Sequence, residues 1–100
     1  MLRHVVMWRF LDSAEGKTKA ENMKLVKESL LALRGRIGEI RHMEIGEDVL
    51  HSDMSFDMGL IIDFDDADAL YAYKNDPEHV KISQYVKKVR SDRATVDWEY

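Results

Sequence analysis

Apolar and polar residues alternate along four segments of the chain, which is the pattern of half-buried β-strands. The four segments are residues 3–10, 37–45, 56–64 and 94–100. In the first segment a histidine and three apolar residues share the even positions, namely His4, Val6, Trp8 and Phe10. The third segment alternates most regularly. The second is broken and has glycines near both ends, so it predicts a weaker strand.

Apolar residues recur at helical spacing in three further segments, which are residues 17–33, 66–75 and 77–89. The first of these helices should end near Gly35. The second begins with aspartates, which suit the N-cap and the positive end of the helix dipole. The third begins with Asp76, Pro77 and Glu78 at the N-cap, N1 and N2 positions, because proline needs no donor there. Residues 47–55 are polar enough to form a loop.

The order of these elements, βαββαβ, is that of a ferredoxin-like α+β fold, with the helices on one face of an antiparallel four-stranded sheet. One hundred residues leave room for one core, so residues 1–100 are predicted to be a single domain. The other sheet face carries Val5, Met7 and Ile61 among charged residues. Scattered exposed apolar residues are common, but three on neighbouring strands favour a homodimer through this face.

The composition, with 45% hydrophobic and 34% charged residues, is that of a soluble globular protein. The net charge of −4 argues against general nucleic-acid binding, and the densest basic run, "YVKKVR", is interpreted as the solvated face of a helix. No apolar run approaches the roughly 20 residues of a membrane span, and no signal peptide is recognised. The chain has no cysteine, which excludes disulfides and thiolate metal sites and favours the cytoplasm.

His79 is the first candidate for chemistry. It would be the third residue of its helix, where the dipole lowers the pKa of an imidazole and keeps it neutral. Neutral imidazole is the form that a general base requires. Spacing alone, however, favours the simpler interpretation of a partly exposed histidine at a helix start.

His4 and Tyr73 would complete an acid–base site. His4 is the polar end of an apolar strand face, so it is either a core histidine bonded to a carbonyl or part of a pocket floor. Tyr73 precedes His79 by six residues and could turn inwards at the break between two helices. These three side chains around one apolar cavity could deprotonate a carbon next to a carbonyl. His42 and His51 are expected at the surface, and no two histidines have the spacing of a helical metal site, so no metal is expected.

Five stretches together resemble the stress-responsive A/B barrel (Dabb) family: "RHVVMWRF", "ENMKLVKESLLALRGRIGEI", "MEIGEDV", "LIIDFDDADALYAYKNDPEHVK" and "VDWEY". The resemblance covers essentially the whole chain. Its most specific parts are the histidine of the first stretch and the segment "DPEHV" with a tyrosine before it. The resemblance implies a ferredoxin-like fold that pairs through its sheets into a dimeric α/β barrel.

The resemblance extends to plant cofactor-free polyketide cyclases typified by olivetolic acid cyclase, which close a linear polyketide by intramolecular aldol condensation. It implies His79 as the base, Tyr73 as its hydrogen-bonding partner and His4 as a pocket histidine. Another pocket histidine of those cyclases falls at Met58, and aromatic residues of their first helix fall near Met23 and Val26. The implied ligand-binding residues are His4, Val6, Trp8, Met23, Val26 and Met58. No cofactor is implied.

The sequence leaves three functional hypotheses. The first is a homodimer that binds a small apolar or hydroxyaromatic molecule in a helix-facing pocket. If it is an enzyme, it acts as a cofactor-independent cyclase or lyase with a histidine base. The second is a non-catalytic stress-related or structural dimer, in which both histidines have only structural roles. The third is a cofactor-free or haem-related monooxygenase of the same superfamily, ranked last because the sequence has no recognisable haem motif.

Overall fold

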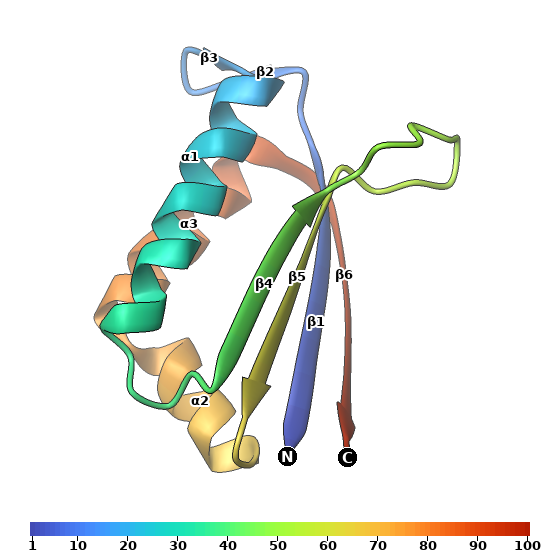
Figure 1. Ribbon diagram of the computed structural model, residues 1–100. Helices are drawn as coiled ribbons and strands as arrows, with labels where there is room; N and C mark the ends of the chain where they lie inside the picture. The colour runs from blue at the N-terminus through green and yellow to red at the C-terminus, as the bar shows by residue number, and fades with distance from the viewer.

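The computed structural model describes residues 1–100 as one main sheet with a layer of helices on one of its faces (Figure 1). The sheet contains the strands β1 (Leu2–Phe10), β4 (His42–Glu47), β5 (Met58–Phe64) and β6 (Arg90–Glu99). The helices are α1 (Lys19–Leu31), α2 (Ala67–Asn75), α3 (Pro77–Val89) and the short 3₁₀ helix η1 (Ala32–Gly35). The strand order is β4-β5-β1-β6 with each neighbouring pair antiparallel, which confirms the predicted ferredoxin-like α+β fold. None of the helices is long and apolar enough to cross a membrane.

The predicted helices are confirmed with small changes at their ends. α1 begins after Thr18, which forms a capping box with Glu21: the Thr18 hydroxyl accepts from the Glu21 amide, and the Glu21 carboxylate accepts from the Thr18 amide. The helix then tightens into η1, which ends at Gly35 as predicted. The starts of α2 and α3 follow Asp66 and Asp76, whose side chains accept hydrogen bonds from the first free amides of each helix.

The strand predicted over residues 37–45 is wrong at its start, because β4 begins only at His42. The amides of Arg36 and Ile37 donate to the carbonyl of Leu33 and continue the helical path beyond η1. Ile37 is nevertheless buried. Its apolar side chain therefore reflects packing at a helix end, and not the alternation of a strand.

The start of β6 and a small hairpin were not evident from hydropathy. β6 begins at Arg90, four residues before the predicted start, and its first residues pair with β1 although they are polar. β2 (Ser13–Ala14) and β3 (Lys17–Thr18) form a separate two-stranded hairpin. Its turn residues, Glu15 and Gly16, both have positive φ, as a type I′ turn requires.

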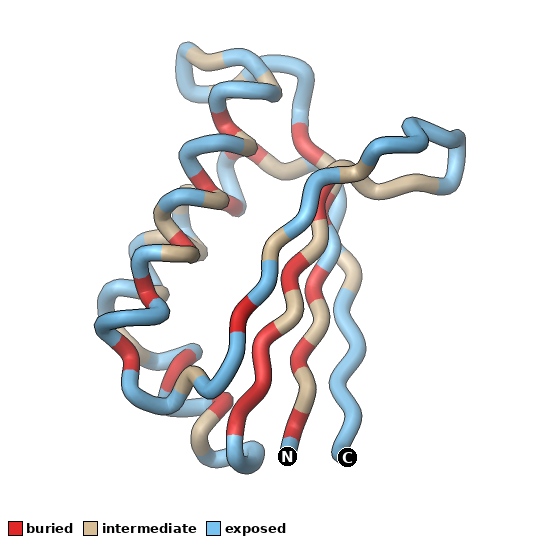
Figure 2. Tube along the Cα trace, in the orientation of Figure 1, coloured by how far each residue is buried: buried red, intermediate tan, exposed pale blue.

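Every second side chain of β1 faces the helices, and the register of the sheet decides which side chains of β5 and β6 lie beside it. His4 lies opposite Ile62 of β5 and Asp97 of β6, so all three side chains share the helix-facing side. The even positions of β1 are buried in the core and the odd positions are partly exposed. Figure 2 shows buried positions on β1 and β5, whereas β6 is almost entirely exposed. β6 is therefore an open edge beside the core.

No helix covers the opposite face of the sheet (Figure 1). Val5, Met7 and Ile61 lie on this face, Val5 directly opposite Ile61. The pairing of β1 with β6 adds Val96 and Trp98, which are 53% and 45% exposed. We call these five residues the outer patch. It is larger than the sequence predicts, because the register that places β6 beside β1 is not visible in the alternation of either strand alone.

A single residue, Asp76, joins α2 to α3. Its amide donates to the carbonyl of Tyr73 at 3.2 Å, and its carboxylate accepts from the amide of Glu78 at 2.9 Å. Pro77 occupies the first position of α3, where no donor is needed. This tight junction holds Tyr73 and His79 close together on either side of the helix break.

Replacing Asp76 with alanine should lower the free energy of unfolding by about 0.5–2 kcal/mol, because the N-cap acceptor of α3 is lost. Asp76→Asn is the matched control, since asparagine keeps an acceptor oxygen and should leave the unfolding free energy close to that of the wild type. Urea unfolding of both variants measures the difference. Equal losses in the two variants would contradict the capping role.

Candidate functional site

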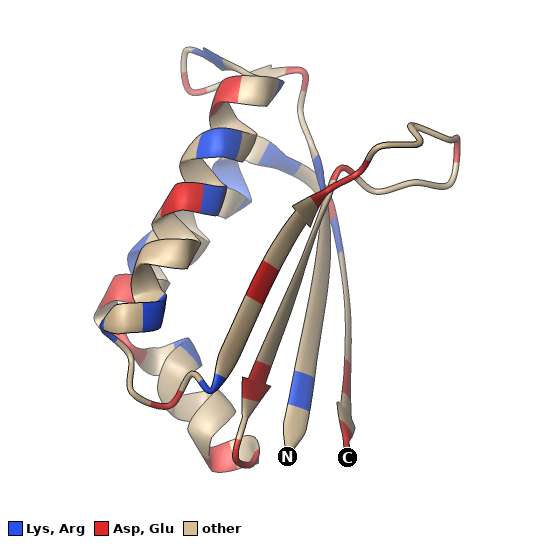
Figure 3. Cartoon of the chain, in the orientation of Figure 1, with Lys and Arg blue, Asp and Glu red and all other residues tan.

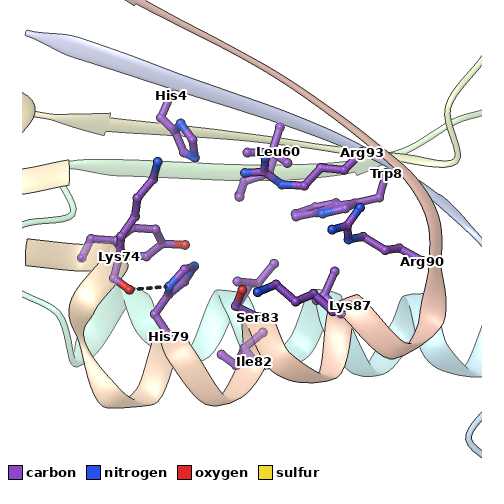
Figure 4. Close-up of a pocket in the computed structure, with 14 residues that line it drawn as sticks. His4, Trp8, Leu60, Lys74, His79, Ile82, Ser83, Lys87, Arg90 and Arg93 are labelled. Atoms are coloured by element: carbon purple, nitrogen blue, oxygen red, sulfur yellow. Dashed lines mark hydrogen bonds between the residues drawn. The ribbon is translucent and has the colours of Figure 1, made fainter. Parts of the chain in front are cut away.

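A cavity of about 280 Å³ lies between the helix-facing side of β1 and β6 and the helix α3 (Figure 4). Its apolar wall consists of Val6, Trp8, Leu30, Leu60, Ile82 and Val86. Its polar lining consists of His4, Tyr73, His79, Ser83 and four basic residues. The volume is just below the usual range for ligand pockets. An apolar wall with a few converging polar groups is the usual composition of a small-molecule site.

The cavity brings together five of the residues named from the sequence, which are His4, Val6, Trp8, Tyr73 and His79. Three others, Met23, Val26 and Met58, do not line it. Val26 and Met58 are buried in the hydrophobic core, and Met23 packs against that core. Met23 and Val26 lie on α1, which reaches the cavity only through Leu30, and Met58 is the first residue of β5.

His79 is half-buried at the third position of α3, and its Nδ1 lies 3.3 Å from the carbonyl oxygen of Lys74. A carbonyl only accepts, so Nδ1 carries the proton and Nε2 is left as the free acceptor. Burial lowers the pKa of His79, the charge of Lys74 and the charge that His4 carries when protonated lower it further, and the Lys74 carbonyl opposes them. The direction agrees with the expectation from the sequence, and burial is the main cause.

His4 is buried beneath the same cavity, and its Nδ1 bonds to the carboxylate of Asp97. The carboxylate accepts, so here too the proton is on Nδ1 and Nε2 is the acceptor. Burial lowers the pKa of His4, against the opposing effect of Asp97. Asp97 was not named from the sequence. The alternation of "VDWEY" places Asp97 on the face opposite Trp98, and this could have marked it as a helix-facing residue. Its pairing with His4 follows only from the register of β1 and β6.

The ring of Tyr73 lies against the ring of His79, with centroids 4.2 Å apart and planes inclined by 44°. It also contacts Phe64, at a centroid separation of 5.2 Å. Tyr73 is 1% exposed, and burial raises the pKa of its phenol well above the usual value. The phenol therefore stays protonated at neutral pH and is a hydrogen-bond donor, not a base.

The four basic residues of the lining are Lys74, Lys87, Arg90 and Arg93. In the run "YVKKVR", interpreted from the sequence as a solvated face, Lys87 is exposed and Arg90 is half-buried, and both also border the cavity. The missed signal is a spacing of four along α3, because His79, Ser83 and Lys87 lie on one side of the helix and all line the cavity. Arg93 lies opposite Trp8 in the sheet, so it also points toward the helices.

The arrangement combines a neutral imidazole with a free acceptor nitrogen, a protonated phenol beside it and an apolar wall. Such a site can remove a proton from a bound molecule and donate a hydrogen bond to the charge that develops. Figure 4 shows His79 directed into the cavity from α3 and His4 directed into it from β1. No three His, Cys, Asp or Glu side chains gather into a set that could hold a metal ion.

Comparison with known proteins places these features in context. The family model described as Stress Responsive A/B Barrel Domain (Dabb) matches residues 2–100. No curated protein matches the chain. A dimeric protein of unknown function with a ferredoxin-like fold from Bacteroides fragilis is 28% identical, with a TM-score of 0.86 over 99% of this chain and 95% of that chain.

Two more distant structures share the fold. A Dabb family protein from Mesorhizobium loti is 18% identical, with a TM-score of 0.77 over 99% of this chain and 95% of that chain. The hydroxynitrile lyase from Passiflora edulis is 11% identical, with a TM-score of 0.81 over 97% of this chain and 90% of that chain. At these identities the likeness concerns the fold alone.

The two cavity histidines should make stability depend on pH. Each has a pKa near 6.5 in the unfolded chain and a lower pKa in the folded protein, so the unfolded state binds more protons below that pH. Their contribution to stability is fully present above about pH 7 and is lost as the pH falls through 6.5 toward the folded pKa values.

Urea unfolding between about pH 7.5 and about pH 5.5 checks this, since carboxylates titrate mainly below that window. The free energy of unfolding should fall toward the acidic end, and it should fall less in His79→Gln, which has one titrating group fewer. A free energy that stays constant or rises as the pH is lowered would show that the histidines are not held neutral by the fold.

Proposed function

We propose that this chain, which belongs to the Stress Responsive A/B Barrel Domain family over residues 2–100, binds a small, partly apolar molecule in its cavity and performs cofactor-free acid–base chemistry on it. The observation that carries the proposal is the pairing of His79 with Tyr73. The imidazole is neutral with Nε2 free, the phenol is protonated, and both line one apolar cavity. His4, held by Asp97, is the orienting group. We propose a cytoplasmic location and neither a nucleic-acid nor a membrane partner.

The reaction that suits these groups best is the ring closure of a linear β-polyketone. Nε2 of His79 takes a proton from a carbon between two carbonyl groups, and the electron pair left on that carbon attacks a third carbonyl of the same molecule. A carbon–carbon bond forms and the π electrons move to the attacked oxygen. That oxygen, hydrogen-bonded by the Tyr73 hydroxyl, takes back the proton carried by His79. Loss of water then completes the ring without a cofactor.

Cyanohydrin cleavage is a second candidate, because a hydroxynitrile lyase shares the fold. In that reaction a base takes the hydroxyl proton, the carbonyl forms and the carbon–carbon bond to cyanide breaks. The leaving cyanide then takes the proton. The same pair of groups would serve as base and proton donor, so both substrates belong in one assay panel. In the non-catalytic alternative, His79 only starts α3 and His4 only fills the core.

His79→Ala should abolish proton removal without unfolding the protein. The probe is ethyl benzoylacetate, a β-keto ester whose central carbon exchanges hydrogen for deuterium, followed by NMR in D₂O. The protein-catalysed rate should fall by roughly 10²–10⁴, the usual contribution of a general base. His51→Ala, at an exposed histidine of the loop before β5, is the matched control and should keep the wild-type rate.

Thermal unfolding of both variants separates catalysis from structure. Wild-type melting with lost exchange in His79→Ala supports the base role. If the wild type exchanges no faster than buffer, or if His79→Ala exchanges as fast as the wild type, the acid–base proposal fails and the non-catalytic alternative remains.

We further propose that the chain is a homodimer that pairs through the outer patch. The patch is apolar, partly exposed and not covered by any helix. Apolar groups on adjacent strands of an uncovered sheet face are stabilised by burial against a second surface. The protein from Bacteroides fragilis, which has the same fold at 28% identity, is dimeric.

Met7→Glu should convert the dimer to a monomer, because Met7 lies in the outer patch and a buried, unpaired carboxylate there is strongly unfavourable. Sedimentation velocity of the wild type and the variant measures the change. Tyr71→Glu is the matched control, since Tyr71 is exposed on α2, away from the outer patch, and should stay dimeric. A monomeric wild type, or a Met7→Glu variant that remains dimeric, would rule out this interface.

A further inference from the structure

The cavity has a strongly basic lining that the acid–base proposal does not use. The residues of this basic cluster are Lys74, Lys87, Arg90 and Arg93. They come from the end of α2, the last turn of α3 and the first part of β6. Figure 3 shows the basic positions around the junction of α3 with β6. No carboxylate belongs to the cavity lining, although the whole chain has a net charge of −4.

None of the four cations takes part in an ion pair within the chain. The carboxylates nearest to Arg93 in the sequence are engaged elsewhere: Asp92 pairs with Arg9 and Asp97 with His4. The helix dipole favours lysines in the last turns of α2 and α3. It does not account for two arginines from β6, nor for the convergence of all four charges on one cavity.

From this convergence we infer that the ligand of the cavity is an organic oxyanion, a small apolar body that carries a carboxylate or phosphate group. The inference rests on the proposed function, because it takes the cavity as the binding site. Guanidinium groups bind carboxylate and phosphate oxygens through paired N–H donors, and lysines add point charges. The cations surround a concave apolar space of about 280 Å³ and not an open face, which suits a small molecule and not a polymer.

The charges of the basic cluster extend along the cavity. Figure 4 shows Arg90 beside Trp8 and Lys74 near His4, whereas the side chains of Lys87 and Arg93 reach from the Trp8 end toward the middle of the cavity. The charge of Arg93 also lowers the pKa of His4 and acts on Tyr73, so an oxyanion held by this cluster would lie close to the candidate acid–base groups. Lys74 lowers the pKa of both His4 and His79, so the cations help to keep the histidines neutral until an anion binds.

Three probes that share a ring and differ in the head group test the inference: benzoate, phenyl phosphate and the neutral benzamide. Binding is followed through the NMR signals of the Trp8 indole and the His79 imidazole. At least one oxyanion should bind roughly tenfold or more tightly than benzamide, and the preference should shrink at about 0.5 M salt. The tighter of the two oxyanions identifies the head group.

Two double variants that remove the same charge provide the matched control. Lys87→Gln/Arg93→Gln removes two cations of the basic cluster, whereas Lys88→Gln/Arg34→Gln removes two exposed cations outside the cavity. The first should lose the oxyanion preference and still bind benzamide. The second should bind all three probes like the wild type.

The outcomes separate this inference from the proposed function. Equal binding of benzamide and both oxyanions, or equal losses in the two double variants, would overturn the oxyanion inference and leave the cavity as a neutral binding site. If neither the three probes nor ethyl benzoylacetate moves the Trp8 and His79 signals, the cavity is not a binding site. The proposed function then fails together with the inference.

Discussion

The pairing of β1 with both of its neighbours is the constraint on which the rest of the structure depends. β1 lies between β5 and β6, and its register decides which side chains meet. It places Asp97 beside His4 and Arg93 beside Trp8 on the helix-facing side, and Val96 beside Val5 on the other. A slip of one residue would exchange the two faces and remove the cavity lining and the outer patch together.

Burial is the main influence that keeps the histidines of the cavity neutral. It disfavours the imidazolium form of His4 and His79, and nearby cations add to this, whereas Asp97 and the Lys74 carbonyl oppose it. Burial also keeps the phenol of Tyr73 protonated. The result is an acceptor and a donor in contact inside one apolar space. An anionic ligand would offset part of the positive potential, and it would therefore couple binding to the protonation of both histidines.

Much of the fold was predictable because alternation and helical spacing are properties of short segments. The helices, β1 and β5 follow directly from them, and so do His4, Val6 and Trp8 on one strand face. The predictions that were wrong concern features that depend on contacts between distant segments. β4 begins later than predicted, because the apolar Ile37 lies at a helix end and not in a strand. β6 begins earlier than predicted, because its polar first residues pair with β1.

The residues of the site also fall into those that the sequence predicts and those that depend on distant contacts. Tyr73 and His79 are close in the sequence, and a helix break marked by Asp76 and Pro77 brings their rings together. Asp97 and Arg93 are about 90 residues from their β1 partners, so only the strand order reveals them. Met23, Val26 and Met58 came from a family resemblance, which fixes neither the path of α1 nor which buried positions of β5 reach the cavity. The basic cluster was hidden because half of it lies in a run that also has a solvated side.

We propose that the fold presents a neutral His79 with a free Nε2 to a ligand cavity. The most direct measurement is a long-range ¹H–¹⁵N NMR spectrum of the histidine side chains at neutral pH, with and without ethyl benzoylacetate. We expect a neutral His79 with its proton on Nδ1, and a shift of its Nε2 signal when the ligand binds. A charged imidazole, a proton on Nε2 or an Nε2 signal that ignores the ligand would contradict it.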